Sequence, residues 1–77
     1  KALTGHGLSL AGALEAGICC LALKEGFMPA NGKVDQLDPA CEGVSILTVR
    51  SDEAPRVAMS HSSGFGGANV ALIFEAI

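Results

Sequence analysis

The stretch from residue 6 to residue 25, HGLSLAGALEAGICCLALKE, constrains the fold more than any other part of the chain. Its leucines and isoleucine, with alanines between them, leave hardly any polar face on a helical projection. Lys24 suits the negative end of a helix dipole, and Gly26 suits the position that follows a helix. The pattern predicts one helix over residues 6–25. Because a helix that is apolar all round is usually buried on every side, we expect other elements to cover it.

The rest of the chain offers little protein surface with which to bury such a helix. Seventy-seven residues form one domain at most, and a domain of this size buries only ~60% of its unfolded surface. Apolar residues make up 49% of the chain and charged residues only 17%. A lone small domain does not usually hide that much apolar surface, so we expect the chain to be a piece of a larger, well-buried core.

Three segments after the helix have the composition of strands. Residues 44–49 (VSILTV) are rich in β-branched side chains, and residues 56–60 and 69–76 continue the pattern. The glycine-rich HSSGFGG between the last two is long enough to turn a hairpin. Residues 27–43 carry turn residues and form a connector. The predicted order is therefore one helix followed by three strands, with the last two paired as a hairpin.

Glu15 is the only ionisable residue between His6 and Lys24. A carboxylate buried in an apolar helix without a partner is costly, so it either takes up a proton or pairs with a cation. Lys1 and His6 are the basic residues nearest in sequence. We favour a pair between Glu15 and one of them, with a small exposed notch around Glu15 as the alternative.

His6 stands at the start of the predicted helix, five residues after Lys1. The positive end of a helix dipole keeps an imidazole neutral, and a neutral imidazole donates one hydrogen bond to a developing oxyanion or accepts one from water. A lone histidine near a helix start is more often a purely structural residue. The nearby carboxylate, which needs a partner, narrows the difference between the two interpretations.

The turn SSGFGGAN, residues 62–69, allows two interpretations. A phosphate cradle would need a lysine and a following helix, and neither is present. A backbone amide aimed at an oxyanion, with Phe65 as a movable apolar lid, is one remaining interpretation. An ordinary hairpin loop is the other.

Several classes of function are disfavoured by composition. The net charge is −3 and the five basic residues are scattered, so the sequence offers no basic patch for binding nucleic acid. We expect no membrane span and no cleavable signal. The histidines and cysteines lack metal-ligand spacing, so we expect no metal. The odd cysteine count, with Cys19 and Cys20 adjacent in an apolar run beside the lone Cys41, favours free thiols in a reducing, cytoplasmic setting.

Four stretches together resemble the C-terminal end of a β-ketoacyl-acyl carrier protein synthase of the thiolase superfamily. They are KALTGHGLSLAGALEA, GFMPANG, LDPACEGV and MSHSSGFGGANVALIFEAI. The motifs K-x-x-T-G-H and G-F-G-G, in this order and spacing, are specific when they occur together. The chain is most similar to the dissociated, type II enzymes of fatty-acid and polyketide synthesis, and the resemblance covers residues 1–77.

The resemblance implies a role for each motif residue. Lys1 would belong to the charge network of the active site, and Glu15 would be the helix glutamate that pairs with it. His6 would be the second active-site histidine, which stabilises the thioester enolate through its ring N–H. Phe65 would be the gating phenylalanine whose backbone N–H is one of two oxyanion-hole donors. The residues implied to contact substrate are Ser63, Gly64, Phe65 and Gly66.

The resemblance also implies the surroundings of the site. The fold would be the C-terminal portion of a thiolase-like αβαβα sandwich, an α/β architecture. The partners would be acyl carrier protein, the remainder of the ketosynthase chain, and a ketosynthase-like subunit in a homodimer or heterodimer. Substrates would arrive on phosphopantetheine, with no other cofactor. The nucleophilic cysteine and the first histidine would lie before Lys1, so we expect the 77 residues alone to be inactive.

Two points stay open at the level of sequence. The enzymes of fatty-acid synthesis usually carry phenylalanine where Ser63 stands, and a small residue there resembles the polyketide ketosynthases, which indicates a roomier acyl pocket. A chain-length-factor-like subunit, which shapes a heterodimer without catalysing condensation, is the alternative to a catalytic ketosynthase. Lys1, His6 and Phe65 favour the catalytic subunit.

Overall fold

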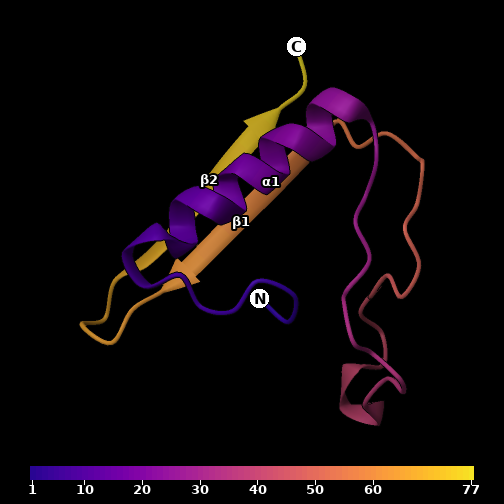
Figure 1. Cartoon of the computed structure of the whole chain (residues 1–77), viewed down its shortest axis with the longest axis horizontal. Helices are drawn as coiled ribbons and strands as arrows, with labels where there is room; N and C mark the ends of the chain where they lie inside the picture. The colour runs from indigo at the N-terminus through magenta and orange to yellow at the C-terminus, as the bar shows by residue number, and fades with distance from the viewer.

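One long helix lies along a two-stranded antiparallel hairpin, and a long connector leaves this unit and returns to it (Figure 1). The computed structural model describes residues 1–77. The elements in chain order are a 3-10 turn η1 (Leu8–Leu10), helix α1 (Ala11–Glu25), a 3-10 turn η2 (Pro39–Cys41), strand β1 (Val57–Ser63) and strand β2 (Asn69–Glu75). No helix is both long enough and apolar enough to cross a bilayer.

The predicted end of the helix is confirmed, and the predicted start is wrong. Gly26 adopts φ 73° and ψ 52°, a left-handed conformation that glycine accepts without strain, and its N–H donates to the carbonyl of Ala22. At the other end, α1 begins at Ala11 rather than at residue 6. Leu8 has φ 53°, which is incompatible with a right-handed helix and so interrupts it before Ala11.

The predicted hairpin is confirmed with small changes in its bounds. β1 covers 57–63 rather than 56–60, and β2 covers 69–75 rather than 69–76. Val57 pairs with Glu75 at one end and Ser63 with Asn69 at the other. The turn between them is closed by a hydrogen bond of 2.8 Å from the Gly64 N–H to the Ala68 carbonyl.

The predicted strand at 44–49 is wrong. These residues form no strand, and Val44 and Val49 expose 66% and 75% of their surface. β-branched residues favour strands because they pack on a pleated surface beside a partner, and no partner strand runs next to this segment here. The connector is held together instead by an isolated bridge between Met28 and Ser51, whose N–H groups each donate to the other's carbonyl.

Beside that bridge, the guanidinium of Arg50 lies 4.4 Å from the centre of the Phe27 ring. We call these four residues, Phe27, Met28, Arg50 and Ser51, the neck of the connector. Because the neck joins the two arms of the connector close to α1 and β1, the residues beyond it form a closed loop (Figure 1).

The expectation that α1 is buried on every side is wrong for this chain. The helix packs against β1 and β2 on one side only, and Ala22 is the single buried residue in the molecule. Leu10, Leu21 and Ile18 of the helix region keep 59%, 50% and 38% of their surface exposed. A two-stranded hairpin is too narrow to cover a helix that is apolar all round, so most of its surface faces outward.

Candidate functional site

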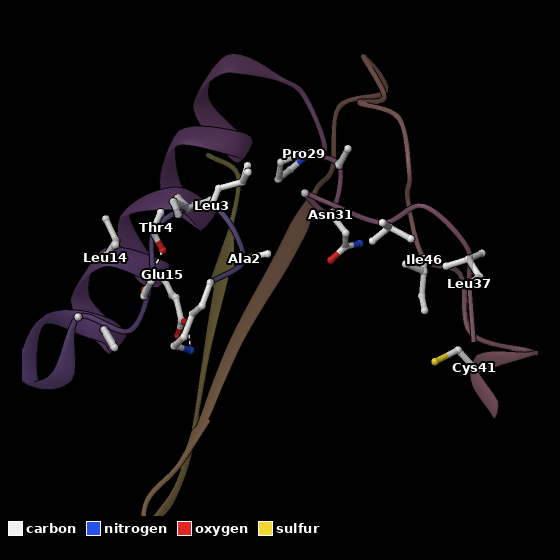
Figure 2. Close-up of a pocket in the computed structure, with 18 of the residues that line it drawn as sticks. Ala2, Leu3, Thr4, Leu14, Glu15, Pro29, Asn31, Leu37, Cys41 and Ile46 are labelled. Carbon is white, nitrogen blue, oxygen red and sulfur yellow. Dashed lines mark hydrogen bonds and ion pairs between the residues drawn. The ribbon is translucent and has the colours of Figure 1, made fainter. Parts of the chain in front are cut away.

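Lys1 and Glu15 form an ion pair between the first turn of the chain and helix α1. Residues 1–5 close on themselves through a hydrogen bond of 2.8 Å from the Gly5 N–H to the Lys1 carbonyl. This turn brings the Lys1 ammonium onto the Glu15 carboxylate, to which it donates a hydrogen bond (Figure 2). The expected pairing of Glu15 with a nearby cation is therefore confirmed, and Lys1 rather than His6 is the hydrogen-bonded partner.

The hydrogen bond from Lys1 holds the pKa of the Glu15 carboxyl below its ordinary value. Partial removal from water acts in the opposite direction, and the positive charge of the Lys1 ammonium adds to the lowering. The Glu15 side chain keeps 26% of its surface and the Lys1 side chain 46%. The carboxylate is thus half-buried and charged, which differs from the deep burial that the sequence pattern indicates.

His6 lies outside helix α1, and its ring orientation is fixed by the backbone that follows it. The Leu8 N–H donates a hydrogen bond of 3.0 Å to Nδ1 of His6. A ring nitrogen that accepts a hydrogen bond carries no proton, so the neutral ring carries its hydrogen on Nε2. The expectation that His6 sits at the helix start is wrong, because α1 begins five residues later and the effect of a helix dipole fades within a turn. A local hydrogen bond sets the tautomer instead.

The left-handed conformation of Leu8 makes this hydrogen bond possible. With φ at 53°, the chain turns back so that the Leu8 amide faces the ring two residues earlier. Such a conformation costs a non-glycine residue roughly 1–2 kcal/mol, and strain of this kind persists where the surroundings enforce it. The sequence gives no signal for Leu8, because leucine is a residue type that avoids this region.

The glycine-rich turn between β1 and β2 presents a free backbone donor. Ser63 is the last residue of β1, and Gly64, Phe65 and Gly66 form the turn. The Phe65 N–H makes no hydrogen bond within the chain, and the Phe65 side chain is fully exposed. The turn is therefore an ordinary hairpin loop in its backbone connections, with one aromatic ring and the unpaired amides of Phe65, Gly66 and Ala68 available to a ligand.

A cavity of about 610 Å³ lies between the first turn, helix α1 and the connector (Figure 2). Lys1 and Glu15 supply its charged side, while Leu14 of α1 and Leu37 and Ile46 of the connector supply apolar surface. His6 and residues 63–66 do not line this cavity. The structure thus brings Lys1 and Glu15 together and leaves the other candidate residues at separate places on the surface.

The three cysteines are free thiols, of which Cys20 is exposed and Cys19 and Cys41 are half-buried. Cys41 lies on the far side of the cavity from Glu15 (Figure 2). No three histidine, cysteine, aspartate or glutamate side chains come together in a way that could hold a metal ion.

Comparison with known proteins identifies relatives for almost the whole chain. The 3-oxoacyl-(acyl-carrier-protein) synthase 1 of Escherichia coli is 39% identical over 75 residues, which is 97% of this chain and 18% of that protein. The mitochondrial 3-oxoacyl-(acyl-carrier-protein) synthase of Arabidopsis thaliana is 41% identical over 78 residues, covering 100% of this chain and 17% of that protein. The chain is homologous to a part of the β-ketoacyl synthases. No family model matches it.

A polyketide enzyme is also among the ketosynthase relatives. The tetracenomycin polyketide synthase ketoacyl synthase alpha subunit of Streptomyces glaucescens is 33% identical over 67 residues, covering 87% of this chain and 16% of that protein. The chain spans less than a fifth of the length of each of these ketosynthases. The resemblance read from the K-x-x-T-G-H and G-F-G-G motifs is confirmed, while the roles of the individual residues stay predictions.

Proposed function

We propose that the chain is the C-terminal part of a β-ketoacyl-acyl carrier protein synthase that extends acyl chains in fatty-acid or polyketide synthesis. In this reaction a malonyl thioester loses carbon dioxide, and the resulting enolate carbon attacks an acyl thioester held on a cysteine. A carbon–carbon bond forms, the bond between the acyl carbon and the cysteine sulfur breaks, and the thiolate leaves. The Lys1–Glu15 ion pair, together with the ketosynthase homology, carries the proposal.

In this proposal His6 donates from Nε2 to the enolate oxygen that develops as carbon dioxide leaves. The Leu8 amide supports this role because it occupies Nδ1 and so directs the ring hydrogen outward. The Lys1 ammonium and the Glu15 carboxylate neutralise each other's charge beside the reacting groups. The acyl-accepting cysteine is none of Cys19, Cys20 and Cys41, so the 77 residues alone carry out no condensation.

The turn between β1 and β2 would serve the acyl thioester. The Phe65 N–H, which has no partner within the chain, donates to the thioester oxygen as the carbon becomes tetrahedral. The Phe65 ring covers the acyl chain, and Ser63, Gly64 and Gly66 form a small-residue wall that leaves room for a bulky or functionalised chain.

The proposal includes the surroundings of the site. The chain contributes α1 and the hairpin to a thiolase-like sandwich, and the rest of the ketosynthase covers the exposed faces of α1. The partners are acyl carrier protein, which presents both substrates on phosphopantetheine, and a second ketosynthase-like subunit. The protein needs no other cofactor, no nucleic acid and no membrane, and its free cysteines favour the cytoplasm.

The test is condensation by the full-length protein, measured as release of labelled carbon dioxide from malonyl-acyl carrier protein and formation of the β-ketoacyl product. His6→Ala should lower the decarboxylation rate by roughly 10²–10³-fold, since it removes one donor to a developing oxyanion. The matched control is His61→Ala, which removes the other imidazole, from the exposed middle of β1, and should leave the rate unchanged. Equal rates for His6→Ala and wild type would contradict the role of His6.

Absence of condensation by the full-length wild type would favour the non-catalytic, chain-length-factor-like subunit instead. The presence of Lys1, His6 and Phe65 together favours the catalytic subunit.

A further inference from the structure

Gly5 joins the first turn, which carries Lys1, to the segment that carries His6. Its backbone has φ 76°, in the left-handed region that residues with a side chain rarely adopt. A Cβ atom built on Gly5 would have nothing within 4 Å, so a side chain has room there. Glycine is therefore required at this position by the backbone conformation and not by the space around it.

The conformation of Gly5 is held on both sides of its Cα atom. On the side of the first turn, its N–H donates to the Lys1 carbonyl at 2.8 Å. On the side of His6, its carbonyl accepts a hydrogen bond of 3.0 Å from the hydroxyl of Thr4. This second hydrogen bond spans the N–Cα bond of Gly5, because Thr4 precedes that bond and the carbonyl follows it. Rotation about φ of Gly5 would therefore break it.

Lys1 and His6 are both tied to helix α1, and Gly5 lies on the path that connects them. Lys1 reaches α1 through its ion pair with Glu15. His6 is joined to α1 by the chain itself, and its ring accepts a hydrogen bond from the Leu8 N–H. The ion pair thus closes a ring in which Gly5 is the joint between Lys1 and His6. A change of φ at this joint turns the segment that carries His6 relative to the turn that carries Lys1.

We propose that Gly5 is a positioning residue, whose left-handed backbone fixes His6 relative to the Lys1–Glu15 pair. The glycine then sets where the hydrogen-bond donor to the enolate oxygen lies with respect to the ion pair, without touching the substrate itself. The kinetic consequence rests on the proposed function, whereas the structural consequence can be measured without any activity.

The first test compares crystal structures of the full-length protein with Gly5→Val and with Gly5→Asn. A β-branched residue is an outlier in the left-handed region, whereas asparagine adopts this region more readily than most residues with a side chain. In the Gly5→Val protein we expect a negative φ and a shift of the His6 ring by about 1 Å or more relative to the Glu15 carboxylate, enough to impair catalysis. In the Gly5→Asn protein we expect a positive φ and an unmoved His6.

Two structural results would overturn the proposal. One is a Gly5→Val protein that keeps the positive φ, because the surroundings and not the glycine would then impose the conformation. The other is a negative φ with His6 and Lys1 both unmoved, because the joint would then not set their relation. Both results can be obtained whether or not the protein condenses acyl chains, so failure of the proposed function is a separate outcome.

The second test measures kcat and KM for condensation by the full-length protein with Gly5→Ala, Gly5→Asn and Gly5→Val. A misplacement of about 1 Å in an active site can cost ~100-fold in rate, so Gly5→Val should lower kcat by up to ~100-fold with a smaller change in KM. Gly5→Asn should keep more of the wild-type kcat than Gly5→Ala, although asparagine is larger, since it accepts the left-handed backbone more readily. Losses that follow side-chain size instead would refute the role of the backbone. If Gly5→Val fails to fold, the order of the other two variants still decides.

Discussion

Urea titration of the isolated 77-residue chain measures how far its stability depends on contacts with other protein surface. The chain exposes 6239 Å². A folded monomer of its mass, 7.8 kDa, is expected to expose roughly 4,400 Å². Its radius of gyration of 13.5 Å likewise exceeds the roughly 11.5 Å expected for a compact domain of this length.

The difference in exposed area is roughly 1,800 Å², of which about 1,000 Å² is apolar if the usual share of surface applies. At ~25 cal/mol per Å², burial of that apolar area would be worth about 25 kcal/mol. Net stabilities of whole domains are only ~5–15 kcal/mol. The burial free energy that the isolated chain is missing therefore exceeds the net stability of a typical whole domain. We expect the isolated chain to unfold without a cooperative transition.

The assay is circular dichroism at 222 nm against urea, with binding of the dye ANS as a second signal. We expect a gradual loss of helix and strong dye binding at low urea. The control is Gly17→Ala, where nothing lies within 4 Å of the added methyl group. It should raise helicity, since alanine is about 1 kcal/mol more favourable than glycine in a helix, without creating a transition. One sigmoidal transition with a slope of about 1 kcal/mol per molar urea or more, and no dye binding, would refute the reasoning.

Three further predictions concern the full-length protein. The pKa of Glu15 is lowered in the folded protein, so its pair with Lys1 stabilises the fold above pH 4.5. This stabilisation is lost as the pH falls through the folded-state pKa. The difference in Tm between wild type and Lys1→Met should therefore shrink on acidification below pH 4.5. Gly26→Ala forces a left-handed alanine at the end of α1 and should destabilise by roughly 1–2 kcal/mol in urea unfolding, whereas an unchanged midpoint would contradict the cap. Phe65→Ala removes a ring without contacts and should change stability by less than about 0.5 kcal/mol while lowering the condensation rate; a large loss of stability would show that the ring is a packing residue.

The parts of the fold that were predictable from the sequence depend on local signals. Gly26 ends the helix because glycine accepts the left-handed conformation, and the turn around Gly64 pairs two strands that are close in sequence. The Lys1–Glu15 pair followed from a physical requirement, since a carboxylate on an apolar helix needs a cation.

The parts that were not predictable depend on surroundings or on strain. Residues 44–49 have strand composition, but strand formation depends on a neighbour with which to pair. The apolar surface of α1 predicted burial, which requires more protein surface than the hairpin supplies. The left-handed Leu8, which sets the start of α1 and the tautomer of His6, contradicts the preference of its own residue type, so no propensity could indicate it.

The neck of the connector makes the distance between α1 and β1 independent of the length of the loop beyond it. Because the Met28–Ser51 bridge closes the loop on itself, insertions or deletions around residues 34–45 leave the helix and hairpin where they are. Doubling a flexible loop costs only about 0.6 kcal/mol in closure entropy. Val34, Leu37 and Cys41 of this loop line the cavity beside the ion pair. Natural length variation or loop grafting here would therefore reshape one wall of the cavity while the opposite, charged wall stays constant.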